Sequence, residues 1–182
     1  MKRLLFAPLI FLITLPVFGE SLDPKILCMR NRVKFDKERT AYISFAKYSL
    51  NTWYPSIEKE KKEAGDKFSY KGPFKEPFKS INDKYNELDD KWGDALTSER
   101  LETIPILKLL GYEKPEKYLY YLYAGYKQLS REYGVKSLDD IEGWNTAQEI
   151  FGYKGIGMTA RDDFCKLFGV EFDYRDDEKL LN

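Results

Sequence analysis

The chain has 182 residues, of which 43% are hydrophobic and 33% charged, so we expect one globular domain with a buried core. The 30 basic and 30 acidic residues cancel, which leaves no overall positive field to attract nucleic acid or an anionic membrane. The chain contains no histidine, which excludes Ser-His-Asp and Cys-His nucleophiles and metal sites built on imidazole. We therefore expect no metal site and no cofactor, and a non-catalytic protein is favoured over an enzyme.

Residues 1–19, MKRLLFAPLIFLITLPVFG, have the pattern of a secretory signal peptide. Lys2 and Arg3 precede an apolar stretch, and Gly19 suits a cleavage site before Glu20. The stretch is short for a hydrocarbon core of about 30 Å and is interrupted by proline. We predict an exported protein, periplasmic or extracellular, with no membrane span after cleavage. A retained N-terminal anchor is the alternative.

Export affects how the two cysteines, Cys28 and Cys165, are interpreted. Two cysteines in an oxidising compartment usually pair, so we predict a Cys28–Cys165 disulfide. Closing so long a loop is worth about 4–5 kcal/mol on the chain-entropy model. The alternative is two buried free thiols.

Residues 20–182 are expected to form a single helical domain. Glycine and proline interrupt the helices predicted for its first half. Asp36 is a candidate N-cap for a helix over 37–51, although the β-branched and aromatic residues there leave a strand open. Pro55 then begins a short charged helix that Gly65 ends.

A third predicted helix begins at Ser80, which forms a capping-box pattern with Asp83. Apolar residues at spacings of four, three and four continue to Trp92, and Gly93 is expected to end this helix. A further helix follows, bent at Pro105.

The tyrosine run YLYYLYAGY, residues 118–126, lies in a predicted helix that Pro115 opens and Gly134 closes. A helical period of 3.6 residues places one set of side chains on a single stripe, which we expect to be buried. This stripe contains Leu119, Leu122, Tyr123, Tyr126, Leu129 and Tyr133. Tyr118, Tyr120 and Tyr121 then face other directions.

Two short helices and a tail are expected to complete the chain. One helix ends at Phe151, the other runs from a Thr159 cap to Phe168, and the acidic tail 171–182 is predicted to be frayed. The fold class is therefore mainly α: a compact single-domain bundle of about six to seven short helices with one long aromatic-rich loop.

That loop, residues 66–80, interleaves aromatic rings with lysines. Rings beside ammonium groups suit an anionic polysaccharide or a single-stranded nucleic acid. The alternative is that the rings anchor the loop to the core while the lysines stay in solvent. The candidate ligand-binding residues are Phe68, Tyr70, Lys71, Phe74, Lys75, Phe78 and Lys79.

The segment GYKGIGMTARDDF, residues 152–164, resembles the hairpin of the helix-hairpin-helix DNA-binding family, in which a Gly-x-Gly turn presents N–H groups to phosphate. That family places three residues between the second glycine and an alanine, whereas only Met158 and Thr159 separate Gly157 from Ala160. We therefore interpret the segment as a glycine turn that leads into a helix.

Acidic pairs such as Asp89–Asp90 and Asp162–Asp163 raise the possibility of carboxylate catalysis, which needs two carboxyl groups facing each other across a cleft. We predict an exported, non-catalytic binding or interaction protein, with a polysaccharide or another envelope component among its candidate partners. A carboxylate-based cell-envelope hydrolase is the alternative, and an exported nucleic-acid binder is the second alternative.

Overall fold

The computed structural model describes residues 23–174 except positions 125, 135, 138–140, 142 and 153. These residues form helices and connecting segments, with no β-strand among them, which confirms the mainly α prediction. The predicted signal peptide at 1–19 and positions 175–182 of the tail lie outside this part of the chain. No helix in it is long and apolar enough to cross a membrane.

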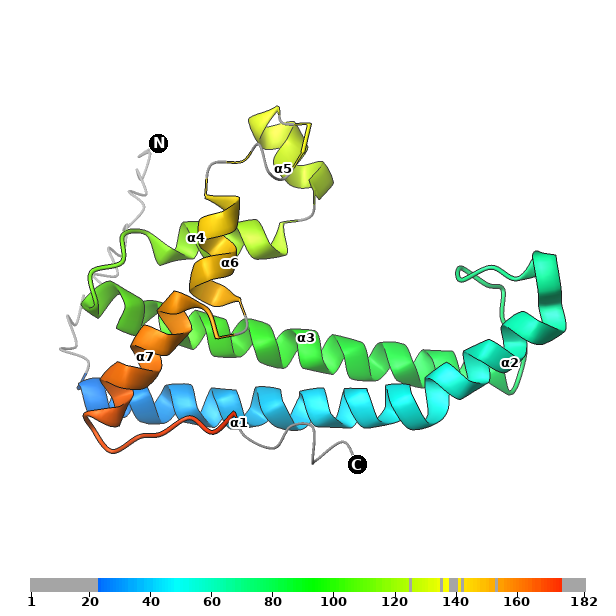
Figure 1. The fold of residues 1–182 in the computed structure, drawn as a ribbon, viewed down its shortest axis with the longest axis horizontal. Helices are drawn as coiled ribbons and strands as arrows, with labels where there is room; N and C mark the ends of the chain where they lie inside the picture. Colours follow the sequence, from blue (N-terminus) through cyan, green and yellow to red (C-terminus); the bar gives the residue numbers. More distant parts are fainter. Residues whose placement is uncertain are drawn as a thin grey trace, which may run out of the picture.

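Two long antiparallel helices, α1 (Pro24–Tyr48) and α3 (Phe78–Leu109), form an elongated body rather than a compact bundle of short helices (Figure 1). Helix α1 begins earlier than predicted because Asp23 caps it: the Asp23 carboxylate accepts a hydrogen bond of 2.8 Å from the Lys25 N–H. The predicted cap, Asp36, lies inside α1 and pairs with Arg32 at 2.9 Å.

Helix α1 continues through a π-helical turn, Ser49–Trp53, into α2 (Tyr54–Ala64), which forms a projecting arm (Figure 1). The turn ends two residues before Pro55, which has no N–H to donate to the helix. A wider turn at that point is a local way to accommodate the missing bond. Gly65 ends α2 as predicted, with a positive φ of 54°.

Helix α3 does not end at Gly93 and contains Pro105 in its interior, contrary to the prediction of two shorter helices. A glycine costs about 1 kcal/mol and a proline about 3 kcal/mol in a helix. Packing along α1 offsets these costs, because aromatic rings from both helices meet between them. Trp53 lies 4.4 Å from Tyr85, and Phe45 lies 5.2 Å from Trp92, as ring centroids.

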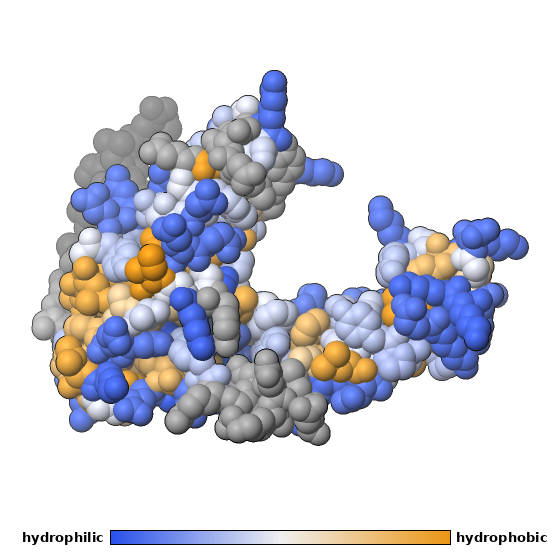
Figure 2. Space-filling model, viewed as in Figure 1, coloured by the Kyte–Doolittle hydropathy of each residue, from blue (hydrophilic) through white to orange (hydrophobic). Residues whose placement is uncertain are grey.

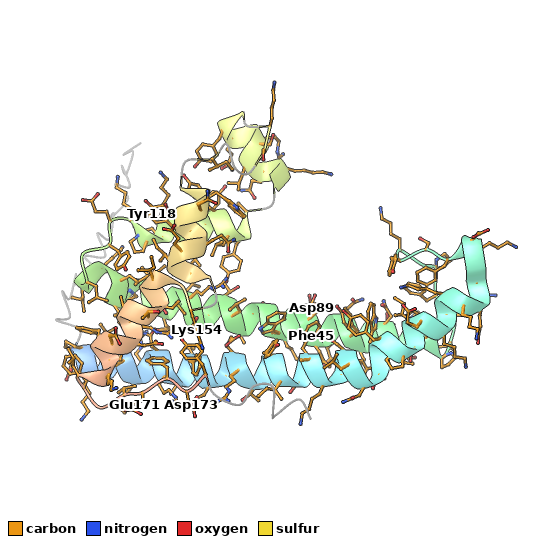
Figure 3. All side chains as sticks on the ribbon, viewed as in Figure 1. Phe45, Asp89, Tyr118, Lys154, Glu171 and Asp173 are labelled. Carbon is orange, nitrogen blue, oxygen red and sulfur yellow. A yellow bond between two sulfur atoms is a disulfide. The ribbon has the colours of Figure 1, made fainter. Side chains whose placement is uncertain are left out.

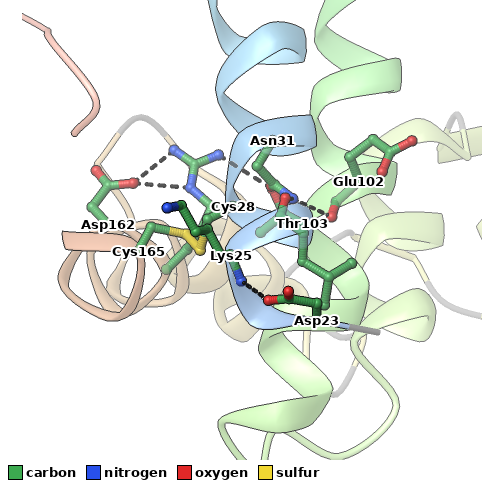
Figure 4. Close-up of a disulfide and its surroundings, with 10 residues drawn as sticks. Asp23, Lys25, Cys28, Asn31, Glu102, Thr103, Asp162 and Cys165 are labelled. Atoms are coloured by element: carbon green, nitrogen blue, oxygen red, sulfur yellow. Dashed lines mark hydrogen bonds and ion pairs between the residues drawn. A yellow bond between two sulfur atoms is a disulfide. The ribbon is translucent and has the colours of Figure 1, made fainter. Parts of the chain in front are cut away.

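The Cys28–Cys165 disulfide is present and fully buried, as predicted, with a Cα–Cα distance of 5.3 Å. It attaches α7 (Ile156–Lys166) to the first turns of α1. Figure 4 shows the bond beside Asn31 and Thr103, which come from the adjacent α1 and α3. The bond is consistent with an oxidising compartment.

The tyrosine run forms two helices rather than one: α4 (Pro115–Tyr123) and α5 (Tyr126–Tyr133). Ala124 between them has an extended backbone, which rotates the second half of the predicted stripe away from the first. Within α4, Tyr121 is buried at 1% exposure, contrary to expectation, in a cluster with Leu129, Ile141 and Ala147. Tyr123 and Tyr133 are 42% and 50% exposed. Leu119 and Leu129 are buried as predicted.

Helix α6 (Trp144–Phe151) packs against α4 and is followed closely by α7. The predicted cap Thr159 lies inside α7, because the helix begins at Ile156 with Gly155 at the cap position. A Cβ atom at Gly155 would lie 2.3 Å from the Glu149 carbonyl oxygen, and one at Gly157 would lie 2.7 Å from Ile150 Cγ2. The two glycines therefore allow α7 to pack directly against the end of α6.

Candidate functional site

A pocket of about 420 Å³ lies where α1, α3, the α6–α7 turn and the segment 171–174 meet. We call it the junction pocket. Figure 3 shows Lys154, which lines it, on the turn between α6 and α7 and above α1. This volume lies within the range of small-molecule sites, which is about 300–1,000 Å³.

Aromatic side chains make up much of the pocket wall. Phe35 comes from α1, Trp92 from α3 and Phe151 from the end of α6. Trp92 is held in place by stacking on Phe45 and by its indole N–H, which donates to the Glu38 carboxylate at 3.1 Å. The wall is therefore a preorganised apolar surface.

Charged side chains also line the junction pocket. Arg39 and Glu38 come from α1, Arg100 and Glu99 from α3, and Lys154 from the α6–α7 turn. Both signs thus reach the same cavity, which lets it hold a polar group at a defined position.

A buried ion pair lies at the base of the pocket, between Glu99 and Arg161. Their side chains are 2% and 0% exposed, and the Arg161 Nη1 donates to the Glu99 carboxylate. Nη1 also donates to Thr103 Oγ1 at 3.2 Å, and Nε donates to Asp162 Oδ1 at 2.9 Å. Thr103 in turn donates to Asn31 Oδ1 at 2.9 Å, so the network joins α1, α3 and α7.

The segment 171–174 is held against this network. The Phe172 ring centroid lies 4.0 Å from the Arg161 guanidinium carbon, within the range of a cation–π contact. Arg161 Nη2 donates to the Tyr174 hydroxyl at 2.9 Å, and the Tyr174 ring lies 4.9 Å from Phe35. Tyr174, from the predicted tail, therefore closes one side of the pocket.

The environment shifts the pKa values of the groups in this network. Burial raises the pKa of the Glu99 carboxyl, and the Arg161 guanidinium opposes that rise. Burial acts to lower the pKa of the Arg161 guanidinium, but the negative charge of Glu99 raises it above its ordinary value, so Arg161 stays protonated. Burial also raises the pKa of the Tyr174 hydroxyl, which therefore remains a neutral phenol at pH 7.

The predicted aromatic-lysine loop lies at the far end of the α2 arm, away from the junction pocket (Figure 1). Its rings form two pairs: Phe68 with Tyr70 at 5.0 Å, and Phe74 with Phe78 at 4.9 Å between centroids. Phe78 is buried at the start of α3, whereas Tyr70 is 65% exposed. The rings therefore do not form one open platform.

The loop's lysines are exposed, and two of the neighbouring ammonium groups already have partners. Lys79 pairs with Asp83 at 2.6 Å, and Lys61 of α2 lies 5.0 Å from the Tyr70 ring centroid. Lys71 and Lys75 extend into solvent from the loop. A binding role for this loop stays a prediction.

Sequence reasoning missed the junction pocket, although one signal in α3 could have indicated it. Buried α3 residues recur at Ala95, Glu99, Thr103 and Leu107, four residues apart. A glutamate in that apolar register predicts a buried cationic partner, because an unpaired buried carboxylate is costly. The identity of the partner, Arg161, depends on the tertiary fold.

A second apolar surface lies at the opposite end of α1 from the arm (Figure 2). It is a shallow depression formed by Ile26, Met29 and Val33, flanked by Arg30 and Lys34.

In the described part of the chain, no cluster of three or more Cys, Asp or Glu residues could hold a metal ion.

Searches of protein-family models, curated proteins and solved structures find no match to this chain.

Proposed function

We propose that this chain is an exported, non-catalytic binding protein and that the junction pocket holds its ligand. The observation that carries the proposal is a preorganised cavity of about 420 Å³ with aromatic walls and a few charged groups, the usual composition of a small-molecule site. Export is supported by the pattern of residues 1–19 and by the disulfide between Cys28 and Cys165.

A carboxylate-based hydrolase is the second candidate, because Glu38 and Glu99 line the same pocket. Two features favour binding over catalysis. Glu99 is 2% exposed and paired with the Arg161 guanidinium, and Glu38 accepts a hydrogen bond from Trp92, so both carboxylates are already engaged by the protein.

Nucleic-acid binding has less support. The Gly-Ile-Gly turn packs directly against α6 through Gly155 and Gly157, and the exposed lysines of the loop lie far from the junction pocket. Single-stranded DNA is the direct probe for this role, since such binding weakens steeply with salt.

Trp92 provides a readout for the proposed ligand site because its indole lines the junction pocket. Small-molecule fractions from the extracytoplasmic compartment are titrated against the chain while tryptophan emission is recorded. We expect a saturable change that Trp92→Phe removes and that the matched variant Trp53→Phe retains, because Trp53 lies at the arm end of α1 and bonds to Asn82.

Leu96→Trp provides the blocking control, because Leu96 lines the cavity and a larger side chain would fill it. We expect it to abolish the emission change while circular dichroism retains the helical signal. An emission change that survives in Leu96→Trp contradicts binding in this pocket. A ligand recovered chemically altered, with turnover lost in Glu38→Gln and Glu99→Gln, instead supports the hydrolase.

A further inference from the structure

The chemistry of the pocket narrows the class of ligand, and this inference rests on the proposed binding function. The wall rings Phe35, Trp92 and Phe151, with Leu96 and Met158 beside them, bury apolar surface of the ligand. Trp92 is already stacked on Phe45 and bonded to Glu38, so its position is set before a ligand arrives. These contacts favour a largely apolar, ring-containing molecule.

The charges favour an anionic group on that molecule. Arg39, Arg100 and Lys154 line the cavity together with Glu38 and Glu99, so the lining carries three cationic and two anionic side chains. The cations remain in excess even when Arg161 is counted together with the Asp162 carboxylate that it contacts. A cavity with walls of low polarity strengthens the attraction of such an excess for an anion.

Arg100 supplies the most specific evidence. Its Nη1 donates to the Tyr123 hydroxyl at 3.1 Å, whereas its Nε is buried with no hydrogen-bond partner in the described part of the chain. A buried guanidinium N–H without an acceptor is unfavourable, and charged groups are the most costly to leave unsatisfied. Arg100 lines the pocket, so an oxyanion bound there meets its guanidinium, whose fork matches carboxylate, sulfonate and phosphate groups.

We infer that the junction pocket takes a small apolar, ring-containing molecule that carries an oxyanion, with the rings against Trp92 and the oxyanion on Arg100. The bound oxyanion pairs with the Arg100 guanidinium, and the Glu99–Arg161 pair closes the base of the cavity without contributing a free charge.

Two dyes that differ only in the charged group test this inference. Anilinonaphthalene sulfonate carries a sulfonate, and N-phenylnaphthylamine is the same ring system without it. We expect the sulfonate to bind about tenfold more tightly, which corresponds to one charge-assisted hydrogen bond of about 1.4 kcal/mol. Higher ionic strength is expected to weaken the binding of the sulfonate and to leave that of the amine unchanged.

Matched variants assign the effect to Arg100. Arg100→Met is expected to reduce sulfonate affinity about tenfold and to leave amine affinity unchanged, because only the charged contact is lost. Arg100→Lys is expected to recover part of the loss. Arg131→Met is the control, since Arg131 is exposed on α5 and does not line the pocket.

The dyes could also bind the apolar surface at Met29, so Met29→Lys and Leu96→Trp are measured in parallel. We expect only Leu96→Trp to abolish binding of both dyes. Equal or tighter binding of the uncharged dye overturns the inference and leaves the proposed function standing. If neither dye binds and no compartment fraction changes Trp92 emission, the proposed function itself is wrong.

Discussion

The Glu99–Arg161 pair allows a quantitative test of how the base of the junction pocket is stabilised. Glu99→Leu removes the carboxylate and leaves a guanidinium with 0% exposure without its main counterion. Breaking a buried pair by removing one partner costs about 3–5 kcal/mol. Asp162 still contacts Arg161 at 2.8 Å, and its side chain is only 24% exposed, so we expect the lower end, about 3 kcal/mol.

The assay is urea unfolding at pH 7, followed by circular dichroism, on four proteins: the parent, Glu99→Leu, Arg161→Met and the double variant. The double variant is expected to be less destabilised than the sum of the single variants, by about 2 kcal/mol, because it buries no unpaired charge. Glu63→Leu is the control. Glu63 pairs with Lys59 on the exposed face of α2 at 3.8 Å, so we expect a change of about 0.5 kcal/mol or less.

Additive effects of the two single variants would refute the coupling between Glu99 and Arg161. A cost for Glu99→Leu as small as that for Glu63→Leu would refute the burial of the pair.

Three further predictions concern the disulfide, a surface charge and the glycines. Replacing Cys28 and Cys165 by serine opens a loop with a sequence separation of 137, which is expected to reduce the free energy of unfolding by about 5 kcal/mol. Titration of two free thiols in the unreduced parent would contradict the bond. Lys84 and Lys91 lower the pKa of Glu87 to about 2. The stability that Glu87 adds relative to Glu87→Gln should therefore be fully present above pH 4.5 and be lost as the pH falls toward 2. A constant difference in stability across this range would contradict the pairing. Gly155→Ala should lower the melting temperature, because its Cβ would lie 2.3 Å from a backbone oxygen. Gly93→Ala, in open space on α3, should raise stability by up to about 1 kcal/mol. The reverse order of the two melting temperatures would contradict the packing of α7 on α6.

Part of the fold could be predicted from local sequence alone. Apolar spacing of three and four residues indicates helices, and Gly65 ends α2 because it tolerates a positive φ without steric cost. The two cysteines could be paired by counting, since an exported chain with two cysteines has one intramolecular pairing. These features depend on properties of a few neighbouring residues or on composition.

Helix ends depended on packing instead. Gly93 and Pro105 are helix breakers by propensity, yet α3 continues through both because one of its faces packs along α1. Tyr121 rather than Tyr123 is buried in α4, because Tyr121 packs in a cluster with Leu129, Ile141 and Ala147, which come from later in the chain. Propensities of about 1–3 kcal/mol per residue are comparable to single packing contacts, so tertiary context can reverse them.

The sequence by itself therefore determined the helical class, the cysteine pair and the pattern of an export signal. Only the tertiary structure decided the junction pocket, because Glu99 and Arg161 are separated by 62 residues and meet only when α7 crosses α3. The alignment of Trp92, Arg100 and Tyr174 around one cavity likewise depends on distances between elements, which no local pattern contains. The same holds for the aromatic-lysine loop: its composition is visible in the sequence, whereas the pairing of its rings is a property of the fold.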